Sequence, residues 1–155
     1  MGKFSEETII EAPRKQVWEV LAEIGSIERW NPGVKRSYAT SPQPGGEGAT
    51  RHCDLQRANG KPAGQLEERA FDWREMEGFR IEITESSLPF SSAVVSFSLA
   101  EAGSGTRVAV SPEYALRYGP AGRLLDALVV RRQYAKGMRA LLAGLKAYVE
   151  TGERS

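Results

Sequence analysis

Arg51 and Glu68 are the residues of this chain whose types and spacing most directly suggest chemistry. Residues 49–56 alternate with period two, so Arg51 and Cys53 share a mostly apolar strand face. The same alternation over residues 64–74 puts Glu68 on the inward face of the next strand. Because burying either charge alone is costly, we expect the two to pair or to contact a ligand. The pair is then either a polar anchor for a carbonyl, carboxylate or hydroxyl of an apolar ligand, or a structural ion pair that keeps the sheet in register.

Three further polar residues lie in the C-terminal third of the chain. Arg131 interrupts the apolar stripe of a long helical pattern. It either faces a ligand or packs its methylenes while the guanidinium reaches solvent or a carboxylate. Tyr114 and Tyr118 stand at the entrance to that helix, where a phenol could donate a hydrogen bond to a ligand.

Composition excludes several classes of protein. Lys and Arg number 21 against 20 Asp and Glu, and this net charge of +1 argues against nonspecific nucleic-acid binding and strong attachment to anionic membranes. With Cys53 as the one cysteine and His52 as the one histidine, neither an intramolecular disulfide nor a Cys-rich zinc site can form, and we expect no metal or cofactor. The two neighbours point to opposite faces of a strand, which argues against a Cys–His nucleophilic dyad.

The chain shows no apolar run of the length that a signal peptide or a transmembrane helix needs. We therefore expect a reduced, cytoplasmic protein without stable membrane insertion.

The elements that must position these side chains follow a simple order. We expect a first strand in residues 1–11, two short helices in residues 13–31, an antiparallel meander over residues 34–116 and one long helix over residues 120–150. Together they predict a single α+β domain over residues 1–155. A curved sheet of about seven strands would wrap around the long helix, and a cavity is expected between the two.

Short motifs along nearly the whole chain resemble those of a known superfamily. They are Ile10-Glu11-Ala12-Pro13 with Val17-Trp18 and Leu21, Ile27-Glu28-Arg29-Trp30-Asn31-Pro32, Gly48-Ala49-Thr50-Arg51, Leu66-Glu67-Glu68-Arg69, Gly105-Thr106-Arg107-Val108 and Leu145-Lys146-Ala147-Tyr148-Val149-Glu150. With the element order, they make the chain similar to the START-like (SRPBCC) superfamily with its birch-pollen-allergen-like helix-grip fold, and to the polyketide cyclase/dehydrase-like family. In that fold the region of Tyr114 and Tyr118 and the loops around residues 88–90 form the cavity mouth.

Side chains that the predicted registers turn inward, with aromatic residues, are the candidate walls of the cavity. Tyr134 is one such aromatic residue, although an aromatic at core spacing is more often plain core. The predicted ligand-binding residues are Trp18, Trp30, Arg51, Cys53, Leu66, Glu68, Phe79, Ile81, Val95, Phe97, Val110, Tyr114, Tyr118, Leu128, Arg131 and Ala135.

Three classes of function fit this fold, which by itself does not decide between them. The leading hypothesis is binding, transport or sequestration of a small hydrophobic ligand such as a lipid, a polyketide or an aromatic metabolite. The second is a polyketide cyclase or dehydratase, for which Arg51, Glu68 and Tyr114 are the candidate catalytic residues. The third is a protein-interaction module of the co-chaperone or toxin-like type, and the chain is expected to be a monomer or a homodimer.

Overall fold

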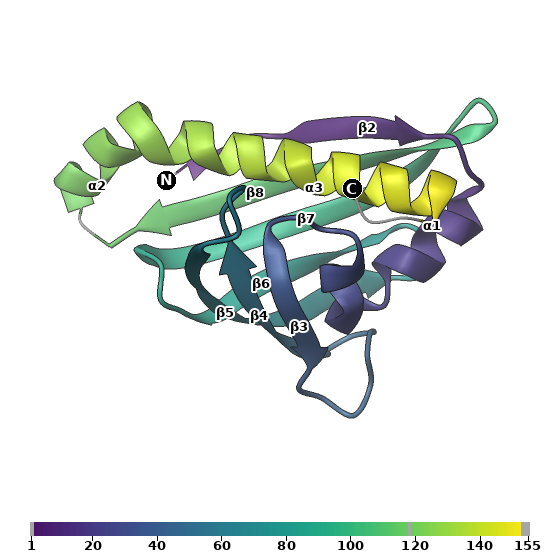
Figure 1. Cartoon of the computed structure of the whole chain (residues 1–155), viewed down its shortest axis with the longest axis horizontal. Coiled ribbons are helices and arrows are strands. Elements are labelled where there is room, and N and C mark those ends of the chain that lie inside the picture. Colours follow the sequence, from purple (N-terminus) through teal and green to yellow (C-terminus); the bar gives the residue numbers. More distant parts are fainter. Residues whose placement is uncertain (1, 118, 153–155) are drawn as a thin grey trace.

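An eight-stranded antiparallel sheet curves around one long helix in the computed structural model, which describes residues 2–117 and 119–152 (Figure 1). This arrangement confirms the predicted α+β helix-grip fold. The elements in chain order are β1 Gly2–Lys3, β2 Glu6–Ile10, α1 Arg14–Leu21, the 3-10 helix η1 Ile24–Arg29, β3 Val34–Ala39, β4 Thr50–Gln56, β5 Pro62–Arg74, β6 Gly78–Ser86, β7 Phe90–Ala102, β8 Gly105–Leu116, α2 Gly119–Leu125, the π-helical segment η2 Asp126–Val130 and α3 Arg131–Thr151.

The sheet runs in the order β1-β8-β7-β6-β5-β4-β3, with β2 also paired to β8. Strands β3 to β8 are therefore a meander, in which each strand pairs with the next along the chain. The single N-terminal strand expected from the sequence is divided in two, because Phe4 and Ser5 interrupt it between β1 and β2. This division gives eight strands where about seven were predicted.

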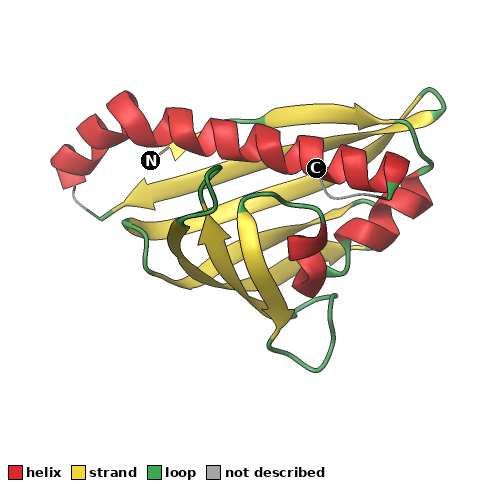
Figure 2. Ribbon diagram, viewed as in Figure 1, coloured by secondary structure: helices red, strands yellow, loops and turns green. Residues whose placement is uncertain are grey.

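The long helix crosses the open side of the curved sheet (Figure 2). Its buried residues include Leu141, Leu142 and Leu145, which belong to the apolar stripe or flank it. Gly144 permits a close approach, because a Cβ there would lie 2.1 Å from the Trp30 carbonyl oxygen. A Cβ on Gly137, two turns earlier, would have no heavy atom within 4 Å. The helix therefore packs tightly near its C-terminal end and leaves space beside Gly137.

The two short helices close one end of the molecule. Helix α1 buries Val17, Trp18 and Leu21, and η1 buries Ile24, Gly25 and Ile27. Within residues 2–117 and 119–152, no helix has the length and apolar character needed to span a membrane.

Candidate functional site

A buried ion pair stands on the concave face of the sheet. Arg51 of β4 and Glu68 of β5 are direct partners in the strand register. Arg51 Nε donates a hydrogen bond to Glu68 Oε1 at 3.0 Å, and both residues are less than a tenth exposed. Arg51 also donates from Nη1 to the Ile24 carbonyl oxygen at 3.0 Å. The guanidinium is thus held from two sides, by the sheet and by η1.

The electrostatics of this pair favour the charged guanidinium. Burial by itself lowers the pKa of Arg51, but the charge of Glu68 and the hydrogen bond to it raise that pKa above its usual value. The Cys53 thiol lies beside the pair, with its Sγ 3.7 Å from Glu68 Oε1. Burial raises the pKa of Cys53 to about 12. The thiol is therefore protonated at neutral pH and is a poor nucleophile there.

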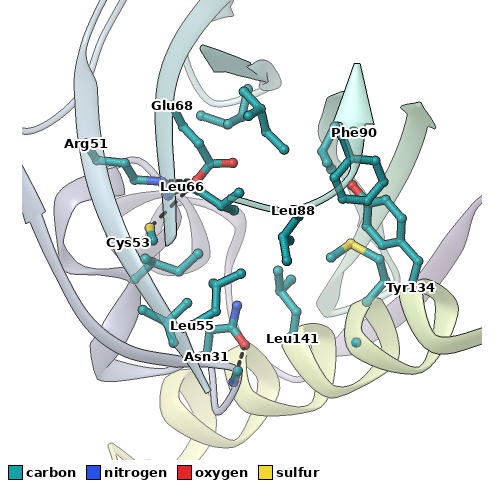
Figure 3. A pocket seen from close by; sticks show the side chains of 18 of the residues that line it. Asn31, Arg51, Cys53, Leu55, Leu66, Glu68, Leu88, Phe90, Tyr134 and Leu141 are labelled. Carbon is teal, nitrogen blue, oxygen red and sulfur yellow. Dashed lines mark hydrogen bonds and ion pairs between the residues drawn. The ribbon is translucent and has the colours of Figure 1, made fainter. Parts of the chain in front are cut away.

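A cavity of about 220 Å³ separates this pair from the long helix (Figure 3). Its walls come from η1, from strands β3 to β7 and from α3, and they are mostly apolar. The lining residues are Ile27, Asn31, Gly33, Val34, Arg51, Cys53, Leu55, Leu66, Glu68, Ile81, Ile83, Leu88, Phe90, Val95, Phe97, Tyr134, Gly137, Met138 and Leu141.

Glu68 and Tyr134 are among the polar groups of this wall that have hydrogen-bonding capacity left over. Glu68 Oε1 accepts from Arg51 and Cys53, whereas Glu68 Oε2 accepts no hydrogen bond from any residue that the structure describes. Figure 3 shows this second oxygen turned away from Arg51 and into the cavity. The hydroxyl of Tyr134 likewise forms no hydrogen bond with the described residues. Burial and the nearby negative charge of Glu68 raise the pKa of Tyr134. The cavity therefore offers a carboxylate oxygen that accepts and a neutral phenol that donates or accepts.

Seven of the sixteen residues predicted to bind a ligand line this cavity. They are Arg51, Cys53, Leu66, Glu68, Ile81, Val95 and Phe97. All seven lie on strands, where the period-two pattern decides which side chains face inward. Their contact with a ligand stays a prediction.

The predicted residues near α1 lie elsewhere, in a packed aromatic cluster. Trp18 contacts Trp73 and Phe79 with ring centroids 5.4 and 6.0 Å apart, and Trp73 stacks on Phe79 at 4.7 Å. Phe79 was predicted to line the cavity, but Trp18 of α1 covers this end of the sheet. Phe79 therefore packs against an indole ring and does not face the cavity. Trp30 is buried under α3 beside Gly144, and Val110 is buried in β8 outside the cavity wall.

The predicted residues near the start of the long helix also lie outside the cavity wall. Tyr114 is buried, and its hydroxyl donates to Asp126 of η2. Arg131 is exposed, with its guanidinium 5.9 Å from the centroid of the Phe4 ring. Ala135 is half-buried on α3 but is not part of the wall.

Two predicted positions fall where the structure gives no side-chain description. Tyr118 lies outside the described residues, and the side chain of Leu128 in η2 is not described either.

Several lining residues were absent from the predicted set. Ile83 shares the parity of Ile81 on β6, and Met138 belongs to the apolar stripe of the helix, so both carried a signal in the sequence. Asn31 and Leu88 lie between elements, where no periodic pattern indicates direction. Within the described part of the chain, no group of three or more His, Cys, Asp or Glu side chains is placed to hold a metal ion.

Comparison with known proteins identifies the family. Residues 1–150 match the family model described as polyketide cyclase / dehydrase and lipid transport. The chain belongs to this family. A comparison with curated proteins gives no match.

Solved structures of other proteins show the same fold. TTHA0849 from Thermus thermophilus has a TM-score of 0.81 and 21% identity, and the alignment covers 97% of this chain and 99% of that one. A START superfamily protein from Mycobacterium smegmatis has a TM-score of 0.77 and 15% identity, with 96% and 97% covered. The di-domain ARO/CYC protein BexL, from the BE-7585A biosynthetic pathway, has a TM-score of 0.77 and 18% identity, with 97% of this chain and 50% of BexL covered.

Membership in the polyketide cyclase/dehydrase and lipid transport family supports either binding of a hydrophobic ligand or a polyketide cyclase role. The choice between these two depends on the chemistry of the cavity.

Proposed function

We propose that the protein binds a small, uncharged and mostly apolar ligand that donates a hydrogen bond to Glu68. The observation that supports this proposal most directly is Glu68 Oε2, which faces a mostly apolar cavity and accepts no hydrogen bond from the described residues. Because this oxygen faces a mostly apolar cavity, a ligand hydroxyl or amine that donates to it gains affinity through a charge-assisted hydrogen bond. A ligand carboxylate cannot donate to it and brings a second negative charge against Glu68.

The volume of the cavity limits the size of the ligand. At about 220 Å³ it is smaller than the roughly 300–1,000 Å³ that is usual for sites of drug-sized ligands. An apolar cavity of about 150 Å³ accommodates benzene. A compound of one or two rings therefore fits the cavity as it stands, whereas a long acyl chain needs the walls to move.

A polyketide cyclase or dehydratase is the alternative function for the same cavity. Acid–base catalysis works best with a group whose pKa lies near the working pH. The pKa of Cys53 is about 12, and that of Tyr134 is raised above its usual value. The Tyr114 hydroxyl is bonded to Asp126 outside the cavity wall, and Arg51 already donates to Glu68 and to a backbone carbonyl. These observations favour ligand binding over proton transfer.

The test compares two probes of similar shape, 2-naphthol and 2-naphthoate, by isothermal titration calorimetry. We expect 2-naphthol to bind and 2-naphthoate to bind at least tenfold more weakly. Native mass spectrometry of the purified protein, with the denatured mass as a control, would show whether a ligand stays bound through purification, as an excess mass that is lost on denaturation. If 2-naphthoate binds as tightly as 2-naphthol, the assigned role of Glu68 is wrong.

Two substitutions on α3 locate the binding. Gly137→Leu places a side chain in the open space beside the cavity, and we expect it to weaken 2-naphthol binding at least tenfold. Ala143→Leu is the matched control, because Ala143 is exposed on the same helix and is not part of the wall. Equal binding by both variants would show that 2-naphthol binds elsewhere.

A further inference from the structure

The charges of this chain are distributed unevenly along the sequence. Residues 117–139, named here the basic segment, carry six Arg and Lys against one Asp. The other residues carry fifteen Arg and Lys against nineteen Asp and Glu. The overall charge of +1 thus conceals a segment of net charge +5 on a chain that is otherwise net negative.

The same segment exposes large apolar side chains. Leu124 is 63% exposed, Leu125 37% and Val129 41%. They are three of the five large hydrophobic residues that the described part of the chain leaves exposed. Since the other two, Ile9 and Tyr38, lie on separate strands, the apolar exposure is concentrated in α2 and η2.

Three cations of the basic segment have no ion pair, hydrogen bond or aromatic-ring contact with the described residues, whereas Arg117 bonds to backbone carbonyls, Arg131 lies over the Phe4 ring and Arg139 pairs with Glu6. The three are Arg123, Arg132 and Lys136, and all of them are exposed. Arg132 and Lys136 are four residues apart on α3, and helical residues at this spacing are neighbours on one face. Cations without such partners among the described residues therefore flank the exposed apolar side chains, Arg123 before them and Arg132 and Lys136 after them along the chain.

The position of the segment connects it with the cavity. Figure 1 shows α2 at the end of the molecule opposite α1, projecting where the long helix begins. Gly137 belongs to the segment, is exposed and also lines the cavity. The basic segment therefore supplies part of the cavity wall, through Tyr134, Gly137 and Met138.

We propose that the basic segment docks on the surface of an anionic lipid bilayer. Arg123, Arg132 and Lys136 attract the headgroups, and Leu124, Leu125 and Val129 enter the boundary between headgroups and acyl chains. An acidic protein surface would meet the cations but gives the exposed leucines no apolar layer to enter. A symmetric contact between two copies would bring the same cations face to face, which disfavours a dimer through this surface.

On α3, Arg132 and Lys136 lie on the helix face opposite Tyr134 and Leu141, which line the cavity, so the docking surface and the cavity wall are separate faces of one helix. Docking itself does not require the ligand proposed above, so the two proposals fail or succeed separately.

The experiment is co-sedimentation of the purified protein with lipid vesicles. We expect binding to vesicles of equal parts phosphatidylcholine and phosphatidylglycerol and little binding to phosphatidylcholine alone. Raising the salt from about 0.1 M to about 1 M shortens the screening length from about 10 Å to about 3 Å and should release much of the protein.

Paired charge reversals identify the surface. Arg123→Glu with Arg132→Glu should weaken binding to the anionic vesicles roughly tenfold or more, because each basic residue near the surface contributes to attraction. Lys15→Glu with Lys35→Glu is the matched control, since both lysines are exposed outside the segment and the net charge changes equally. Leu124→Ser with Val129→Ser should also weaken binding while leaving the charge unchanged.

Three results would overturn the proposal. One is the absence of binding to anionic vesicles, and another is an equal loss in the segment and control variants. The third is a wild-type dimer, seen by sedimentation velocity, that becomes a monomer in the double variant Leu124→Ser with Val129→Ser. This result would show that a second copy of the chain covers the apolar surface. In the absence of vesicles, the affinity for 2-naphthol measured by calorimetry should be the same in the wild type and in the double variant Arg123→Glu with Arg132→Glu. The test of membrane docking is therefore independent of the test of ligand binding in the cavity.

Discussion

Arg51 and Glu68 face each other across neighbouring strands, and the 3.0 Å hydrogen bond between them lies at the wall of an apolar cavity. Only one oxygen of Glu68 is used by this pair and by the Cys53 thiol. The sequence left open whether the pair anchors a ligand or is a structural ion pair, and this geometry is compatible with both roles at once. Arg51 and Oε1 form a structural ion pair, and Oε2 is available for the ligand that we propose.

Removing Arg51 alone should destabilise the fold. Arg51→Met leaves the buried carboxylate of Glu68 without its cation, and we expect the free energy of unfolding to fall by about 3 kcal/mol. Replacing both residues, as Arg51→Met with Glu68→Leu, should restore much of that loss because no buried charge remains. Urea denaturation of the wild type and the single and double variants measures the coupling. Additive losses in the double variant would show that the two residues stabilise the fold independently.

The two glycines of α3 should respond oppositely to a methyl group. Gly137→Ala meets no heavy atom within 4 Å, and we expect it to stabilise the protein by up to about 1 kcal/mol through helix propensity. Gly144→Ala would bring its Cβ to 2.1 Å from the Trp30 carbonyl, and we expect a loss of about 2 kcal/mol as the helix is displaced. Thermal and urea unfolding compare them directly. A loss in both variants would mean that α3 is packed as closely at Gly137 as at Gly144.

The Cys53 thiol should be inert in the folded protein. It is 1% exposed, and burial raises its pKa to about 12. We expect an aromatic disulfide reagent to label Cys53 slowly at pH 8 in buffer and rapidly in urea, because only unfolding exposes the thiol and restores its ordinary pKa. Fast labelling under native conditions, with a rate that levels off near pH 8.5, would contradict the buried position.

The strand pattern predicted the ion pair because a period of two leaves only two directions for a side chain. Arg51 and Glu68 each share a face with apolar neighbours, so the alternation alone places both on the concave side of the sheet. The outer limits of the meander, residues 34 and 116, also agree with the observed β3 and β8. These successes depend on contacts between residues that are close along a strand or directly opposite in register.

The tyrosines show what such a pattern cannot reveal. Tyr114 was expected at the cavity, but its hydroxyl is bonded to Asp126 in a π-helical segment that no periodicity indicated. Tyr134, a candidate wall residue in the sequence, lines the cavity, and its hydroxyl forms no hydrogen bond with the described residues. Both outcomes depend on where the long helix lies across the sheet, and that position is decided by packing such as the contact at Gly144.

His52 provides a pH-dependent test on the outer face of the sheet. Its Nε2 lies 2.7 Å from Asp54 Oδ1, its Nδ1 is hydrogen-bonded to Glu67, and its ring stacks on Tyr38 with a centroid separation of 5.0 Å. The hydrogen bonds to Glu67 and Asp54 raise the pKa of His52 above its ordinary value of 6.5. Because folding raises this pKa, the added stability is fully present below pH 6.5 and is lost as the pH rises through the folded value.

The free energy of unfolding of the wild type should therefore exceed that of His52→Gln by more at about pH 6 than at about pH 9. His52 is the one histidine of the chain, so its ring protons give unambiguous signals for an NMR titration. We expect the midpoint of that titration to lie above 6.5 in the wild type and to move back toward 6.5 in Glu67→Gln. A wild-type midpoint at or below 6.5 would show that the two carboxylates do not hold the charged ring in solution.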